Sequence, residues 1–141
     1  MRANQESIRC NAQRGVMMKA APIAATFFWT WNTPFAQVLS DRYNKLGDMQ
    51  QVLGNSQAAL ALYQQGLEIA ERLSNSVPEN TEFARNLWVS YWKCATVSEG
   101  DEQMQWWRKV HSALTTMQER GILSKSDEQR IAVVKTLLGL D

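Results

Sequence analysis

The chain has 141 residues, 45% of them hydrophobic, and its 15 basic and 14 acidic side chains leave a net charge of +1. This composition excludes an intrinsically disordered chain, and the near-balance of charge disfavours a nucleic-acid-binding surface, which usually carries a basic excess. One histidine and two separated cysteines, Cys10 and Cys94, supply too few ligands for a metal site, so we expect no metal and no cofactor. Two unpatterned cysteines also do not form a disulfide framework.

Residues 1–31 are predicted to form an N-terminal leader or irregular segment ahead of the first regular helix. Residues 1–16 are polar, whereas residues 20–31 are apolar and rich in aromatic side chains. Twelve apolar residues are too few to cross a bilayer as a helix, which needs about twenty, so we expect no membrane span. The apolar stretch is expected to cover the end of the helical region that follows, with a homodimer through this apolar N-terminal end as the alternative.

Residues 17–36 share some features with a signal peptide, because Met17 or Met18 with Lys19 would give a short basic start before the apolar stretch. The polar residues ahead of this start and the lack of a small-x-small cleavage pattern disfavour export. We therefore expect a cytoplasmic protein.

A firm helical pattern begins at Thr33, where Pro34 suits the first turn of a helix. Apolar residues then follow at steps of three and four and predict one buried helical face: Leu39, Tyr43, Leu46 and Met49 or Gln50. Gly54 ends this helix, and Asn55 is predicted to cap the next one, over about 55–75. That second helix carries the small residues Ala59 and Gly66, which allow a neighbouring helix to approach closely.

Residues 32–45 recur as residues 80–93, with seven of fourteen positions identical and each pair 48 residues apart. The identical positions are Asn32/Asn80, Thr33/Thr81, Phe35/Phe83, Ala36/Ala84, Leu39/Leu87, Tyr43/Tyr91 and Lys45/Lys93. A period of 20–50 residues is typical of stacked supersecondary units. The chain is therefore predicted to contain two copies of one helical unit.

The second copy predicts a helix over about 81–98, with Cys94 as a buried apolar residue, and a helix over about 102–119 with Asp101 as its N-cap. A last helix is predicted over about 126–138. Ser124 and Asp127 form a capping-box pattern at its start. Its polar outer side is what a terminal capping helix requires.

The first copy resembles a tetratricopeptide repeat, in a variant with a long period. The resemblance rests on an aromatic residue followed by Leu-Gly on the first helix, a glycine at the turn, and spaced small and aromatic residues on the second. The matching residues are Tyr43, Leu46, Gly47, Gly54, Ala59, Tyr63 and Gly66. The second copy keeps Tyr91 but has Cys94-Ala95 in place of Leu-Gly.

The resemblance implies an all-α fold, a short right-handed α-solenoid of two helix-turn-helix repeats plus a C-terminal capping helix. The units would be residues 32–79, residues 80–121 and the cap at residues 122–141. It also implies a non-catalytic module, a scaffold or adaptor, whose first helices line a concave groove for a peptide segment of another protein. Eight residues map to this groove: Asp41, Asn44, Asp48, Gln51, Val89, Trp92, Thr96 and Glu99.

Trp92 has two interpretations, an anchor for the partner or a side chain that packs on a neighbouring helix. No nucleophile with an acidic orienter accompanies His111, so we do not expect an enzyme. Two alternatives differ from a peptide-binding module. One is a helical-repeat RNA-binding protein, in which tryptophans stack on bases. The other is the truncated end of a larger multi-repeat signalling scaffold, because solenoids usually need three or more units.

Overall fold

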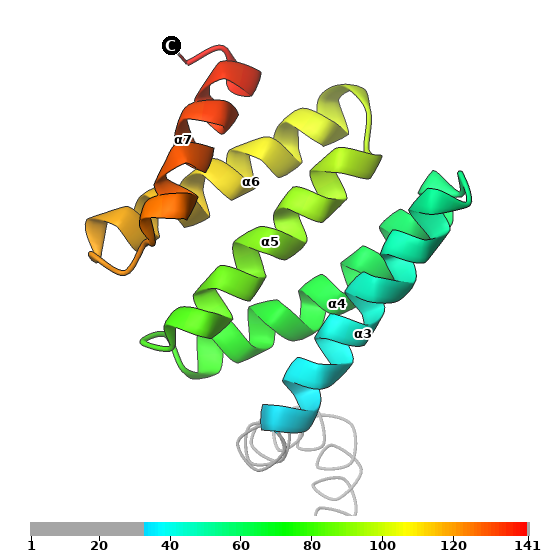
Figure 1. Cartoon of the computed structure of the whole chain (residues 1–141), viewed down its shortest axis with the longest axis horizontal. Helices are drawn as coiled ribbons and strands as arrows, with labels where there is room; N and C mark the ends of the chain where they lie inside the picture. The colour runs from blue at the N-terminus through cyan, green and yellow to red at the C-terminus, as the bar shows by residue number, and fades with distance from the viewer. Residues whose placement is uncertain (1–32, 141) are drawn as a thin grey trace, which may run out of the picture. The chain divides into compact units, whose positions relative to one another are not determined.

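A computed structural model of the protein describes residues 33–140, which contain five α-helices and no strand (Figure 1). The helices are α3 (Thr33–Val52), α4 (Ser56–Ser76), α5 (Thr81–Val97), α6 (Gly100–Glu119) and α7 (Lys125–Leu138). The all-helical prediction is confirmed for these residues. The predictions on the leader, on export and on Cys10 lie outside the described residues.

Neighbours in sequence are neighbours in space: α4 packs on α5, α5 on α6, and α6 on α7 (Figure 1). α3 contacts both α4 and α5. The Ser40 hydroxyl of α3 donates to the Gly66 carbonyl of α4 at 2.9 Å, and Asn44 of α3 reaches Ser90 of α5. The arrangement therefore places α3 and α5, the first helices of the two sequence copies, in direct contact.

The helix ends follow local capping chemistry. The side chains of Asn80 and Ser124 accept from the backbone N–H groups three residues ahead, at 3.1 and 3.2 Å, and cap α5 and α7. Gly54, at φ +80°, ends α3 as predicted. Asn55 holds the N-cap position of α4, but its side chain donates to Gln50 instead of capping.

The predicted N-cap of α6 was wrong by two residues. Glu99 is the N-cap, and Asp101 lies in the first turn of the helix. Gly100 adopts φ +61°, a left-handed conformation open to glycine, so the chain turns into the helix earlier than the Asp101 pattern suggested. The acidic side chain still lies where the helix dipole favours it.

The main core lies between α5, α6 and α7. Its buried members are Ala84, Trp88, Ala95, Trp107, Val110, Leu114, Met117, Ile131 and Val134. The buried residues of α6 and α7 recur at steps of three and four residues, as the inner face of a helix requires. A second cluster joins Ala59, Tyr63 and Leu67 of α4 to Cys94 of α5, and the predicted burial of Cys94 is confirmed.

The predicted buried face of α3 was wrong at Leu46 and Met49, and Leu39 and Tyr43 are only partly buried. Leu46 is 48% exposed and Met49 62% exposed, whereas the buried residues are Ala36, Ser40, Asn44 and Gly47. The reason is the close approach of α3 to α4. A Cβ atom at Gly47 would lie 2.6 Å from Tyr63 Cδ1, and a Cβ at Gly66 would lie 3.1 Å from the Ser40 carbonyl oxygen. Only small side chains fit this crossing, so the large apolar ones lie on the other side of α3.

Candidate functional site

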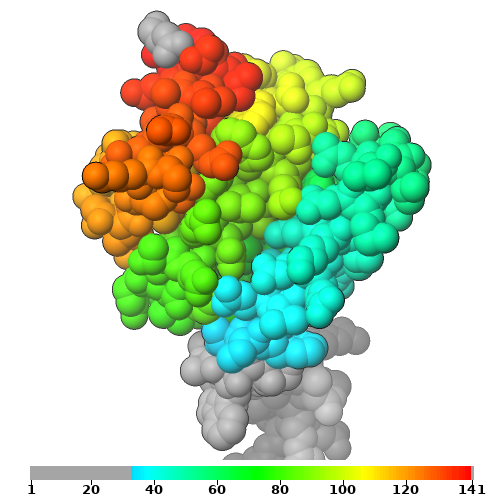
Figure 2. All heavy atoms as spheres, in the orientation of Figure 1, coloured from blue at the N-terminus to red at the C-terminus, as the bar shows by residue number. Residues whose placement is uncertain are grey.

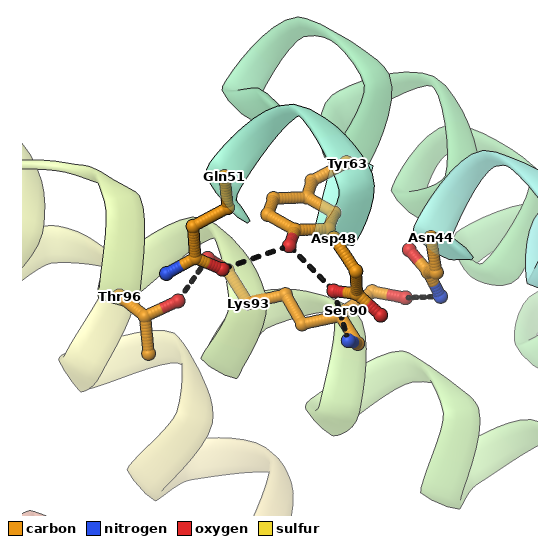
Figure 3. Close-up of polar contacts among 7 residues, drawn as sticks. All are labelled: Asn44, Asp48, Gln51, Tyr63, Ser90, Lys93 and Thr96. Atoms are coloured by element: carbon orange, nitrogen blue, oxygen red, sulfur yellow. Dashed lines mark hydrogen bonds and ion pairs between the residues drawn. The ribbon is translucent and has the colours of Figure 1, made fainter. Parts of the chain in front are cut away.

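Polar side chains from three helices meet where α3, α4 and α5 come together (Figure 3). We call this group the polar seam. It consists of Asn44, Asp48 and Gln51 of α3, Tyr63 of α4, and Ser90, Lys93 and Thr96 of α5. Three of its members come from the predicted groove of the first copy and one, Thr96, from that of the second. The seam is therefore the place where part of the predicted site is assembled.

Asp48 is the centre of the polar seam. Its Oδ1 accepts from the Tyr63 hydroxyl at 2.6 Å and from Lys93 Nζ at 2.6 Å (Figure 3). The Asp48 side chain is 46% exposed and that of Lys93 27% exposed. An ion pair with this degree of solvent exposure contributes about 0.2–1 kcal/mol to stability. Asp48 therefore links three helices at small energetic gain and keeps an edge that faces solvent.

Tyr63 is fully buried, and it fills the space that Gly47 leaves open. Burial, followed by the hydrogen bond to Asp48, raises the pKa of Tyr63 well above that of a free phenol. The phenol thus stays protonated and donates to Asp48, with Gln51 Oε1 at 3.2 Å as a second acceptor. Lys93 Nζ lies 5.5 Å from the ring centroid, within cation–π range.

Asn44 holds the inner end of the seam and is buried. Its Nδ2 donates to Ser90 Oγ at 3.5 Å, a long and weak hydrogen bond. Asn44 Oδ1 is buried with no hydrogen-bond partner among the described residues. The sequence expectation that Asn44 lines an open groove is therefore corrected, because the contact between α3 and α5 covers it.

The remaining predicted groove residues divide into two groups. Asp41, Gln51, Thr96 and Glu99 are exposed, and with the half-exposed Asp48 they lie on α3, on α5 or at the N-cap of α6. Val89 and Trp92 are only partly exposed and pack against the core of α5, α6 and α7. Apart from the buried Asn44, the structure thus brings the polar members of the prediction to the surface and places the two apolar members against other helices.

Trp92 has three partners within the chain. Its ring packs edge-to-face on Trp107, with centroids 4.8 Å apart, and on Trp88, with centroids 6.2 Å apart. The Arg130 guanidinium of α7 lies over the same rings, 5.2 Å from Trp92 and 5.6 Å from Trp88. Of the two sequence-based interpretations of Trp92, packing on a neighbouring helix accounts for its surroundings.

A buried charge fixes α7 beside this aromatic group, and sequence reasoning missed it. Asp127 is 2% exposed. Its Oδ2 accepts a hydrogen bond from Arg85 Nε at 3.2 Å, and its Oδ1 forms an ion pair with Arg130 Nε at 3.7 Å. Asp127 also lies in the first turn of α7, where the helix dipole favours a negative charge. The capping pattern at Ser124 gave the position of Asp127, but nothing local in the sequence pairs it with Arg85, 42 residues away.

A cavity of about 320 Å³ lies away from the polar seam, where Ser74 of α4 meets α5 and α6. Its lining includes the cationic side chains Lys109 and Arg120 and the half-buried Tyr91. Lys109 Nζ lies 4.7 Å from the Trp106 ring centroid and 5.8 Å from that of Tyr91. Burial and a hydrogen bond to Glu71 raise the pKa of Tyr91 above its ordinary range. Lys109 thus lies over two aromatic rings, and the phenol of one of them, Tyr91, stays neutral.

Residues 33–140 hold no group of three or more acidic, histidine or cysteine side chains placed to bind a metal ion. Across the same stretch, every helix is too short or too polar to cross a membrane. Comparison of the chain with protein-family models, with curated proteins and with solved structures gave no match.

Proposed function

We propose that residues 33–140 form a short right-handed α-solenoid of the tetratricopeptide type and act as a non-catalytic protein-interaction module. One observation carries the proposal: α3 and α5 lie side by side, joined by Asp48 to Lys93 at 2.6 Å and by Asn44 to Ser90. These are the first helices of two sequence copies 48 residues apart. In a solenoid, the contact between equivalent helices is what builds a continuous binding surface.

The partner segment would bind along the exposed edge of the polar seam. This edge offers the carboxylates of Asp48 and Glu99 and the amide of Gln51. Carboxylate oxygens accept from backbone N–H groups and pair with basic side chains. The surface therefore suits an extended or helical segment that carries lysine or arginine, with Lys93 limiting the net negative charge at the centre.

A non-catalytic role agrees with the acid–base state of the buried groups. Burial raises the pKa of the Cys94 thiol to about 12, so the thiolate needed for nucleophilic attack is absent at neutral pH. The phenol of Tyr63 is held protonated in the same way. Both groups lie where α4 packs on α5, and their packing explains their residue types.

Site-specific photo-crosslinking tests the proposal. A photoreactive amino acid replaces the exposed Gln51 at the seam, and a matched chain carries it at the exposed Gln64 on α4. We expect a protein adduct at position 51 that excess basic peptide suppresses, and none at position 64. Equal adducts at both positions would reject the assigned surface. An RNA adduct that disappears steeply with added salt would instead support the helical-repeat RNA-binding alternative.

A further inference from the structure

The outer face of α3 is an apolar stripe, defined by six residues that are 48% to 88% exposed. They are Phe35, Val38, Leu46, Met49, Val52 and Leu53. At 100° per residue they lie on the side of α3 opposite the buried Ser40 and Asn44. Their exposed surface amounts to roughly 600 Å², at the upper limit for the largest apolar patch of a typical monomer. In Figure 2, α3 (cyan) forms one edge of the described residues.

The corresponding face of α5 shows what such a stripe binds. Phe83 and Cys94 are the residues 48 positions after Phe35 and Leu46, and both are buried. Cys94 packs among Ala59, Tyr63 and Leu67 of α4, and Val97, the counterpart of Met49, packs on the same cluster. In the second copy this face therefore receives a helix. Among the described residues, no helix covers the stripe of α3.

We propose that the apolar stripe is a homodimer interface, in which α3 of one copy packs antiparallel on α3 of a second copy. This inference does not depend on the polar seam, which uses another face of α3. The stripe is self-complementary about Asn44 in sequence. Phe35 and Leu53 lie equally far from that position, and Val38 and Met49 do so to within one residue. A two-fold axis would place Phe35 of one copy on Leu53 of the second copy, and Val38 of one copy on Met49 of the second. An isologous interface requires such reciprocal contacts.

The charges beside the stripe fit the same symmetry. Asp41 and Lys45 are exposed on one flank of the stripe, and an antiparallel two-fold axis brings equal flanks together. Asp41 of one copy then lies near Lys45 of the other, giving two opposite-charge pairs for each dimer. The net charge of +1 leaves little repulsion between copies.

The size of the stripe suits a dimer of modest affinity. Standard interfaces bury about 800 Å² on each partner, and the stripe with its charged flank approaches that value. One uncompensated arginine lies at the centre of the contact, which weakens it. Replacing Arg42 by leucine removes the cost of desolvating that charge and completes the apolar surface.

Sedimentation equilibrium of the full chain provides the first test. We expect a reversible dimer whose dissociation constant rises at least tenfold in Met49→Glu and falls several-fold in Arg42→Leu. Leu137→Glu is the matched control, because Leu137 is a similarly exposed apolar residue on α7; it leaves the dimer unchanged. Circular dichroism confirms that each variant is folded. A wild-type chain that stays monomeric to about 100 µM overturns the proposal, as does a dimer that Leu137→Glu dissociates.

Charge exchange tests the register. Asp41→Lys and Lys45→Asp each place like charges together and weaken the dimer, and the double exchange restores it. The same exchange at Glu68 and Arg72, an exposed pair with equal spacing on α4, leaves the dimer unchanged. Equal effects of the two exchanges would contradict the register.

Disulfide cross-linking tests the direction of the two helices. In a Cys10→Ser background, chains with Val38→Cys are mixed with chains with Met49→Cys. An antiparallel pair yields chiefly the mixed 38–49 disulfide. Dominant links between identical positions would indicate a parallel pair and overturn the proposal.

Discussion

α3 and α5 share one sequence pattern, yet they bury different faces. Phe35 and Phe83 occupy equivalent positions, but Phe35 is 62% exposed and Phe83 4% exposed. The difference comes from their neighbours. α5 lies between α4 and α6, whereas α3 contacts α4 and α5 through its small residues. A repeated sequence therefore fixes which surfaces a helix can offer, and the number of helices around it decides which of them are buried.

The two helices also differ in what holds their inner faces. α5 presents Trp88 and Trp92 to α6 and α7, where aromatic packing and Arg130 stabilise the core. α3 presents Ser40, Asn44 and Asp48, which form hydrogen bonds across its two neighbours. Apolar burial contributes about 25 cal/mol per Å², while each net hydrogen bond contributes about 1 kcal/mol. We therefore expect α5 to dominate stability and α3 to tolerate truncation of its exposed side chains.

The largest expected effect comes from truncating the equivalent phenylalanines. Phe83→Ala should lower the free energy of unfolding by about 3–5 kcal/mol, because it leaves a cavity at a buried position. Phe35→Ala should change it by less than about 1 kcal/mol, because most of that ring is already in water. Urea denaturation measures both losses, at a protein concentration too low for the proposed dimer to form. Equal losses would show that α3 is as enclosed as α5.

The second prediction concerns the crossing of α3 and α4. Gly47→Ala places a methyl group against the Tyr63 ring and should cost about 1–3 kcal/mol. At the equivalent position α5 already carries Ala95, so only the first copy needs glycine there. In a Tyr63→Leu background the same change should become neutral or stabilising, because alanine favours helix by about 1 kcal/mol once the ring is gone. An unchanged cost in that background would place the clash elsewhere.

The sequence was informative where a contact is local or repeated. The helix order and the capping serine at 124 follow from short spacings, and the buried Cys94 follows from the repeat. The buried face of α3 did not follow, because apolar periodicity marks a face that can bind a helix without showing whether one binds it. The same holds for the candidate site. The resemblance to a tetratricopeptide repeat grouped Asp48 with Gln51, but only the fold brings Lys93 to Asp48 and Arg85 to Asp127.

The pH dependence of stability tests the burial of Cys94, and the exposed Leu46 at the equivalent position of α3 provides the control. The pKa of Cys94 is raised from 9.0 to about 12 in the folded chain, chiefly by burial. A raised pKa favours folding fully below pH 9 and less as pH rises above it, because the unfolded thiol ionises first. Stability should therefore fall above pH 9, by about 1 kcal/mol at pH 10 from this group. Cys94→Ala should remove that part of the slope, and Leu46→Ala should leave it, in denaturation curves measured from pH 7 to 10.

The smallest expected effect on stability lies at Asp48, where α3 and α5 are joined. Asp48→Asn removes the ion pair with Lys93 but keeps an acceptor for the Tyr63 hydroxyl, so unfolding should become easier by less than about 1 kcal/mol. Arg72→Gln, which breaks the exposed pair with Glu68, provides a control of similar size. The proposed binding surface predicts a contrast in affinity: Asp48→Asn should weaken binding of a basic peptide several-fold, and Arg72→Gln should not. A stability loss of several kcal/mol in Asp48→Asn would instead mean that the polar seam is a structural element of the fold, with α3 dependent on it as α5 depends on Trp88.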